Sequence, residues 1–181
     1  MTPEQIVLVD YAGQPVGKAD KLASHHLHTP LHLAFSCYIF NAKGKFLLTR
    51  RADSKKVWPG VWTDSLCGHP SPDEDMPAAI NRRAQEELGI TVHDLIVALP
   101  DYRYKTPPFN GVVENEICPV FLARTHDSVK LNPEEVAGYK WVEWSAFVHE
   151  ALNDTEDRLS WWCKDQLKHL VNHPELHKFI V

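Results

Sequence analysis

The chain has 181 residues, of which 44% are hydrophobic and 24% are charged, and its formal net charge is −5 at pH 7. This size and composition predict one globular domain, spanning residues 1–181, with a sizeable hydrophobic core. The negative charge argues against a general nucleic-acid-binding surface, and no segment approaches the roughly 20 apolar residues that a membrane span needs.

The N terminus and the cysteines predict the cellular setting. The first residues lack the basic start and the long apolar stretch of a signal peptide. The four cysteines lie far apart and form no Cys-x-x-Cys pair, so neither a disulfide framework nor a thiolate zinc site is expected. We therefore expect a cytoplasmic protein without a nucleic-acid, membrane or obligate protein partner.

The first half of the chain contains several short predicted elements. In chain order they are a strand at 6–9, a turn at 10–15, one or two helical turns at 18–26, and strands at 33–40 and 45–49. The last two strands are separated by Asn41-Ala42-Lys43-Gly44, which predicts a hairpin.

A longer helix is predicted from Met76 to Leu88. Apolar residues recur at every fourth position of this segment and form one apolar stripe. Pro77 falls in the first turn, where a missing N–H costs little, and Gly89 is suited to the C-cap.

The second half of the chain completes the predicted architecture. Its elements are strands at 95–105, 112–124 and 139–142, followed by helices at 144–152 and 159–171. No repeat, linker or low-complexity run divides the chain. Together the elements predict an α+β fold, in which helices cover both faces of one mixed β-sheet.

One long spacing pattern surrounds the predicted helix. Gly68 is followed after five residues by Glu74, and after seven more by Arg82-Arg83-Ala84-Gln85-Glu86-Glu87-Leu88-Gly89-Ile90. This pattern resembles the Nudix box, except that the box has Glu where this chain has Arg83. In Nudix hydrolases the carboxylates of this helix hold magnesium ions. Replacing one with a guanidinium removes a metal ligand and adds a fork that can bind phosphate.

Other segments narrow the resemblance. They are His32-Leu33-Ala34-Phe35-Ser36, Arg50-Arg51-Ala52-Asp53-Ser54-Lys55-Lys56, Ser65-Leu66-Cys67-Gly68-His69-Pro70 and Val113-Glu114-Asn115-Glu116-Ile117-Cys118-Pro119. Together with the altered box they resemble the type 1 isopentenyl-diphosphate delta-isomerases of the Nudix superfamily, from Leu8 to about Trp162. The resemblance implies a Nudix-like mixed β-sheet sandwiched between α-helices. It also implies isomerisation of isopentenyl to dimethylallyl diphosphate, a step of isoprenoid precursor biosynthesis.

A metal site is predicted around two glutamates. Glu114 and Glu116 are two residues apart on a predicted strand, so their carboxylates share one face and repel each other unless a cation lies between them. Imidazoles of His25, His32 and His69 could complete the site, with Mn²⁺, Zn²⁺ or Mg²⁺ as the ion. By resemblance, all five residues bind one divalent ion. The alternative is a solvent-exposed pair of glutamates.

A diphosphate site is predicted from the basic residues. Arg51, Lys55 and Arg83 are the expected contacts, with Lys21 as a fourth, because guanidinium groups can hold phosphate oxygens in pairs. Glu87 lies one helical turn from Arg83 and could hold a Mg²⁺ that bridges to the same diphosphate. The alternative is a solvated positive patch.

The implied reaction requires two proton-transfer groups, because a proton is added at C4 and another is removed from C2. Cys67 and Glu116 are the candidates, although a free cysteine is often only a packing residue. By resemblance, Tyr104 donates a hydrogen bond to Glu116. Trp161 occupies the position of an active-site tryptophan whose ring face would stabilise a tertiary carbocation-like intermediate.

Three other functions agree with parts of the sequence. A Nudix pyrophosphohydrolase would explain the box, but it would have no use for Cys67 and would need a carboxylate at Arg83. A diphosphate-binding module without enzymatic activity would need no acid–base pair. A zinc protein using scattered His and Cys would need paired ligand spacing, which is missing. We therefore predict an isomerase acting on a small prenyl diphosphate.

Overall fold

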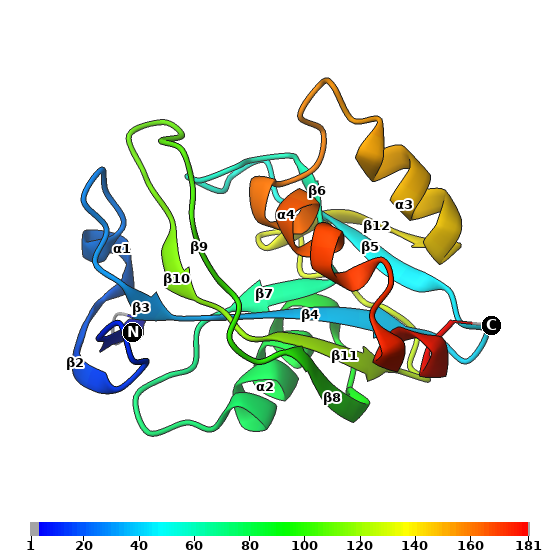
Figure 1. Cartoon of the computed structure of the whole chain (residues 1–181), viewed down its shortest axis with the longest axis horizontal. Helices are drawn as coiled ribbons and strands as arrows, with labels where there is room; N and C mark the ends of the chain where they lie inside the picture. The colour runs from blue at the N-terminus through cyan, green and yellow to red at the C-terminus, as the bar shows by residue number, and fades with distance from the viewer. Residues whose placement is uncertain (1–3, 181) are drawn as a thin grey trace.

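The computed structural model describes residues 4–180 and has an α+β fold, which confirms the predicted class (Figure 1). Five helical segments occur in this range: α1 Lys21–Ser24, α2 Met76–Leu88, α3 Trp144–Leu152, α4 Trp161–Leu170 and the 3-10 helix η1 Pro174–Lys178. Among residues 4–180, no helix combines the length and the apolar character that crossing a bilayer requires.

The larger sheet has seven strands. They are β4 Phe35–Phe40, β5 Phe46–Arg51, β6 Trp62–Thr63, β7 Leu66–Gly68, β8 His93–Leu99, β11 Val120–Arg124 and β12 Val136–Val142. The order is β12-β5-β4-β11-β8, with β6 paired to β5 and β7 paired to β4. The sheet is mixed, because β4 and β11 are parallel and the remaining pairs are antiparallel.

The smaller sheet has five strands. They are β1 Gln5–Val9, β2 Pro15–Asp20, β3 His32–Leu33, β9 Arg103–Lys105 and β10 Asn115–Ile117, in the order β2-β1-β3-β10-β9. Two extended segments continue from this sheet into the larger one, β3 into β4 and β10 into β11, and they remain parallel neighbours across both sheets. The two sheets are therefore joined along these segments.

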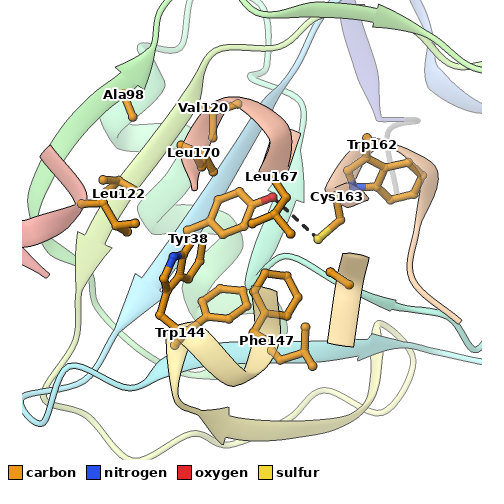
Figure 2. Packing of buried hydrophobic residues seen from close by; sticks show 14 of the residues in the cluster. Tyr38, Ala98, Val120, Leu122, Trp144, Phe147, Trp162, Cys163, Leu167 and Leu170 are labelled. Atoms are coloured by element: carbon orange, nitrogen blue, oxygen red, sulfur yellow. Dashed lines mark hydrogen bonds between the residues drawn. The ribbon is translucent and has the colours of Figure 1, made fainter. Parts of the chain in front are cut away.

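The core lies on both faces of the larger sheet because side chains alternate along β4. Phe35, Cys37 and Ile39 pack with buried residues of α2. Tyr38 and Phe40 point to the opposite face and pack with α3 and α4. Figure 2 shows this second face, where Tyr38 lies among Trp144, Phe147 and Leu167.

The sequence prediction for α2 is confirmed at both ends. The helix begins after Asp75, whose side chain accepts a hydrogen bond from Ala78 N at 2.8 Å. Pro77 lies in the first turn, and Gly89 ends the helix with a φ of 62°. A Cβ at position 89 would lie 3.0 Å from Lys130 Cβ, so both the backbone conformation and the close contact favour glycine.

Two of the predicted strands are broken at a proline and divided between the sheets. The strand predicted at 95–105 becomes β8 and β9, because Pro100 has no N–H and begins a turn with Asp101. The strand predicted at 112–124 becomes β10 and β11, and the break falls at Pro119 for the same reason. The described chain therefore has two sheets where a single mixed sheet was expected, and the two strand breaks account for this difference.

The N-terminal prediction also needs correction. Gly13 has a φ of 79° and reverses the chain, so residues 15–20 return as β2 alongside β1. The helical turn predicted at 18–26 begins only at Lys21, after its N-cap Asp20.

Candidate active site

The candidate site is a cavity of about 420 Å³ beside the junction of the two sheets. Most of the predicted site residues contribute to its wall: Lys21, His25, Arg51, Lys55, Cys67, His69, Arg83, Glu87, Tyr104, Glu114 and Glu116. His32 is fully buried behind the wall, where its ring contacts His69. Among the predicted site residues, only Trp161 neither lines this cavity nor belongs to the group of histidines and glutamates that could hold a metal ion.

We use the name histidine wall for His25, His32, His69, Glu114 and Glu116. Four of these residues, all except Glu114, place one ligand atom each within 4.8 Å of one another. His69 Nε2 lies 3.2 Å from His32 Nε2 and 3.2 Å from Glu116 Oε1. Glu114 Oε2 lies 3.3 Å from His25 Nε2, which extends the group by a second carboxylate.

The protonation of these rings can be inferred from their backbone contacts. His25 Nδ1 is 2.5 Å from Lys21 O, and His32 Nδ1 is 2.9 Å from Pro30 O. A carbonyl oxygen only accepts, so each Nδ1 must donate, and the Nε2 of a neutral ring is left as an acceptor. Both Nε2 atoms face carboxylate oxygens, which are also acceptors.

Two hydrogen-bond acceptors that face each other repel unless a cation lies between them, so this arrangement favours a bound cation. Glu114 Oε2 and His69 Nδ1 are also buried and have no hydrogen-bond partner among the described residues. Imidazole nitrogens and carboxylate oxygens are the ligands of Zn²⁺ and Mn²⁺, and carboxylates also suit Mg²⁺. The residues therefore fit a divalent ion, whose identity they leave open.

The ionisation of the wall agrees with this interpretation. Burial lowers the pKa of His69 to about 3, so this ring is neutral at physiological pH, as a metal ligand must be. Burial acts to raise the pKa of Glu116, but the adjacent His32 and His69 rings outweigh it and hold the pKa well below its usual range. His25 departs from this pattern, because Glu114 outweighs burial and raises the pKa, so a metal ion would have to displace a proton from this ring.

Two other predicted catalytic residues, Cys67 and Tyr104, lie next to the histidine wall. Tyr104 is the cross-strand partner of Glu116, and Cys67 lies in β7 opposite Ser36 of β4. Burial raises the pKa of the Cys67 thiol well above its usual value, and the Asp64 carboxylate raises it further. The thiol is therefore protonated at neutral pH.

The two adjacent tryptophans lie differently with respect to the cavity. Trp162 contributes to the cavity wall, whereas Trp161 lies outside it and stacks on Tyr104 with ring centroids 5.8 Å apart. Both follow the N-cap Ser160, and successive residues of a helix point about 100° apart, so only one of the two rings faces inward. Trp162 is also a buried core residue, so it serves the core and the cavity together.

We use the name arginine wall for the charged residues around α2: Lys55, Arg83, Glu86, Glu87 and Glu135. Arg83 Nε lies 3.0 Å from Glu87 Oε1, its Nη1 lies 2.9 Å from Glu86 Oε2, and its Nη2 lies 3.2 Å from Glu135 Oε2. Lys55 also pairs with Glu135. Burial raises the pKa of Glu87 above its usual value, and Arg83 counteracts this effect.

Two further cations also have protein partners. Lys21 Nζ is 3.0 Å from Glu4, and Arg51 donates to the carbonyls of Val57 and Trp58. All four cations predicted to bind diphosphate therefore lie at the cavity, and each is already neutralised or hydrogen-bonded within the protein. A solvated patch is excluded for Arg83, whose side chain is only 10% exposed.

Several wall residues had no sequence signal. Glu4 and Glu135 enter the site through tertiary contacts with Lys21, Lys55 and Arg83. Arg82 was left out of the predicted site, and the structure gives it an orienting role. It binds Glu74 at 2.8 Å and donates to the carbonyl of His69 at 3.2 Å.

The sequence comparisons agree with this geometry. The profile of the NUDIX domain matches residues 30–163. A relative from Saccharopolyspora erythraea, named isopentenyl-diphosphate delta-isomerase, is 57% identical over 168 residues, which cover 93% of this chain and 86% of that protein. The chain belongs to the isopentenyl-diphosphate delta-isomerases of the Nudix family. A relative of the same name from Paenarthrobacter aurescens is 48% identical over 93% of this chain and 91% of its own length.

Solved structures are similar to this isomerase in fold. A protein from Deinococcus radiodurans has a TM-score of 0.64 at 19% sequence identity and covers 83% of this chain and 90% of its own. A Nudix hydrolase from Burkholderia pseudomallei has a TM-score of 0.56 at 21% identity, over 77% of this chain and 98% of its own. The Nudix fold is therefore shown by structure as well as by sequence.

Proposed function

We propose that this chain converts isopentenyl diphosphate to dimethylallyl diphosphate, and so contributes to isoprenoid precursor biosynthesis. The observation that carries the proposal is the presence, in one cavity, of the histidine wall and the protonated thiol of Cys67. The thiol can give a proton to an alkene, and Glu116 is a carboxylate that can exchange one, as protonation–deprotonation requires. Family membership supports the same reaction.

The roles of the two groups follow from the chemistry. Protonation at C4 and loss of a proton from C2 leave the carbon skeleton and the diphosphate unchanged. Positive charge develops at C3 between these steps. The faces of the Trp162 and Tyr104 rings are suited to this charge, because aromatic rings attract cations without reacting with them. Trp161 contributes by supporting Tyr104, and a direct role for Trp161 stays a prediction.

Metals would serve two purposes in the proposal. The histidine wall would hold a divalent ion, which when bound polarises the Glu116 carboxylate and alters its proton affinity. Glu87 would hold a Mg²⁺ that neutralises the substrate diphosphate. For this, Arg83 would have to exchange part of its contact with Glu87 for phosphate oxygens, with Arg51, Lys55 and Lys21 completing the charge balance.

The proposed reaction can be tested with purified protein and isopentenyl diphosphate, followed by proton and phosphorus NMR. We expect dimethylallyl diphosphate to form without release of phosphate. Cys67→Ala should abolish product formation, whereas Cys118→Ala, which changes a buried cysteine beside Ser36, should retain it. Release of phosphate without the allylic product would instead identify a hydrolase and refute the proposal.

The cellular setting forms part of the same proposal. All four cysteines are free thiols in the structure. A cysteine that must remain a thiol to transfer protons is suited to a reducing compartment, and we propose the cytoplasm.

A further inference from the structure

Two loops meet next to the cavity and are joined by a pair of aromatic rings. The β5–β6 loop carries Val57 and Trp58, and the β9–β10 hairpin carries Phe109 and Val112 (Figure 1). The two valines belong to the cavity wall. The rings of Trp58 and Phe109 stack next to them, with centroids 4.9 Å apart and an interplanar angle of 19°.

The hairpin holds Phe109 in a fixed position. Phe109 N donates to Val112 O at 2.8 Å, and Val112 N donates to Phe109 O at 2.9 Å. The two residues between them, Asn110 and Gly111, have φ values of 46° and 79°, as a type I′ turn requires. Asn-Gly is the sequence that such turns favour, so the local sequence itself orients the Phe109 ring.

Trp58 is held in an unfavourable backbone conformation. Its φ of 47° lies in the left-handed region, which is strained for a bulky residue. Arg51 stabilises it by donating to the Trp58 carbonyl at 3.1 Å and to the Val57 carbonyl at 2.9 Å. The Trp58 side chain is only 8% exposed, and it meets the ring of Trp162 at 5.3 Å and 86°. Strain next to an active site points to a functional constraint.

We infer that Trp58 and Phe109 form an aromatic clasp, which keeps water out of the cavity during the reaction. This inference rests on the proposed function. Neither ring lines the cavity, so both are positioning residues: the stack holds Trp162 and Val112 together from opposite sides. Because a closed apolar wall limits access of solvent, the clasp determines which product forms.

Water exclusion matters because the intermediate is electrophilic at C3. If water reaches it, the water oxygen bonds to C3 and one water proton passes to a base. The product is then 3-hydroxy-3-methylbutyl diphosphate, the sum of isopentenyl diphosphate and one water. With the clasp closed, water is excluded and the cation can only lose a proton: loss from C2 gives dimethylallyl diphosphate, and loss from C4 returns isopentenyl diphosphate.

The test is the ratio of these two products, measured by mass spectrometry with purified protein and ¹³C-labelled isopentenyl diphosphate. Phe109→Ala should raise the share of the hydroxylated product by about tenfold, which corresponds to roughly 1.4 kcal/mol in relative barrier. Phe109→Tyr keeps the stacked ring, so this variant should have the wild-type product ratio. Phe179→Leu removes a buried ring that packs on Phe40, away from the cavity, and should lower stability without changing the ratio.

The outcomes distinguish a failure of the clasp from a failure of the proposed function. An unchanged product ratio in folded Phe109→Ala would overturn the clasp while leaving the proposed function intact. An equal rise in Phe179→Leu would also overturn it, because the effect would then follow stability alone. If the wild-type protein forms no dimethylallyl diphosphate, the proposed function fails, and the clasp fails with it.

Discussion

The two charged walls of the cavity neutralise their carboxylates in different ways. On the histidine wall, Glu114 and Glu116 face imidazole nitrogens that are themselves acceptors. On the arginine wall, Glu87 and Glu135 contact Arg83, and Glu135 also contacts Lys55. Among residues 4–180, the carboxylates of the first wall therefore pair with no lysine or arginine, whereas those of the second wall do.

This difference separates what each wall can bind. A cluster of acceptors is suited to a cation that comes from outside the chain. A balanced salt-bridge network can accept a diphosphate only by exchanging carboxylates for phosphate oxygens or by taking up a further cation. Changes in the histidine wall should therefore affect metal binding and chemistry, and changes in the arginine wall should affect stability and substrate binding.

The largest effect is expected on the histidine wall. Glu116→Gln removes a carboxylate that lies within 3.2 Å of His69 Nε2, and turnover should fall by about 10²–10⁴-fold. Glu134→Gln is the matched control, because Glu134 is an exposed glutamate at the same cavity. Steady-state kinetics should show a lower kcat in the first variant only. Equal turnover in both variants would contradict the role of Glu116.

A substitution in the arginine wall should mainly affect stability. Arg83→Met removes the cation that contacts Glu87, whose side chain is only 12% exposed, and removal of one partner from a buried pair costs about 3–5 kcal/mol. Adding Glu87→Gln should recover part of this loss in urea unfolding, and KM should remain raised. Arg82→Met, at a more exposed arginine, should cost far less. A similar loss of stability in both variants would show that the burial of the arginine does not determine the cost.

Metal removal should distinguish the walls directly. If divalent ions are present at 100–1,000 times their dissociation constant, a chelator should lower the free energy of unfolding by about 2.7–4.1 kcal/mol. The effect should persist in Arg83→Met and disappear in His69→Ala, as measured by calorimetric melting with and without chelator. The reverse pattern would place the stabilising ion at the arginine wall.

Asp64 belongs to neither wall and sharpens the comparison. It is fully buried and has no salt bridge to any residue in the range 4–180, and burial raises its pKa from 3.8 to about 6. A raised folded-state pKa means that stability is fully present below pH 4 and is lost as the pH rises through 6, by up to roughly 3 kcal/mol. Asp64→Asn can still accept from Thr63 and Trp162, and it should remove this loss.

The measurement for Asp64 is urea unfolding of both proteins at pH 4 and pH 8. The variant should gain stability relative to wild type as the pH rises. Stability curves that stay parallel between these pH values would show that Asp64 does not titrate in this range.

The parts of the fold that were predicted correctly depend on local signals. Helix α2 carries its own start, its apolar stripe and its ending glycine within one short segment. The histidines and glutamates of the site were found because they lie within matched segments of a known family. Their gathering in one cavity agrees with that expectation, although their catalytic roles stay predictions.

The parts that were missed depend on tertiary contacts. Nothing near Glu135 indicates that it meets Arg83, which lies 52 residues away. Which of Trp161 and Trp162 faces the cavity depends on the rotation of α4, and this is set by packing. The tip of the β9–β10 hairpin is different, because Asn110-Gly111 is a known turn signal that lies directly before the strand predicted at 112–124.

The account is tested most directly by running the reaction in heavy water. The proton at C4 must come from a protein group that exchanges with solvent, and the C2 proton must leave to another. We therefore expect deuterium in a methyl group of dimethylallyl diphosphate and at C2 of recovered isopentenyl diphosphate, with no release of phosphate. Dimethylallyl diphosphate that forms without deuterium would contradict the proton-transfer mechanism.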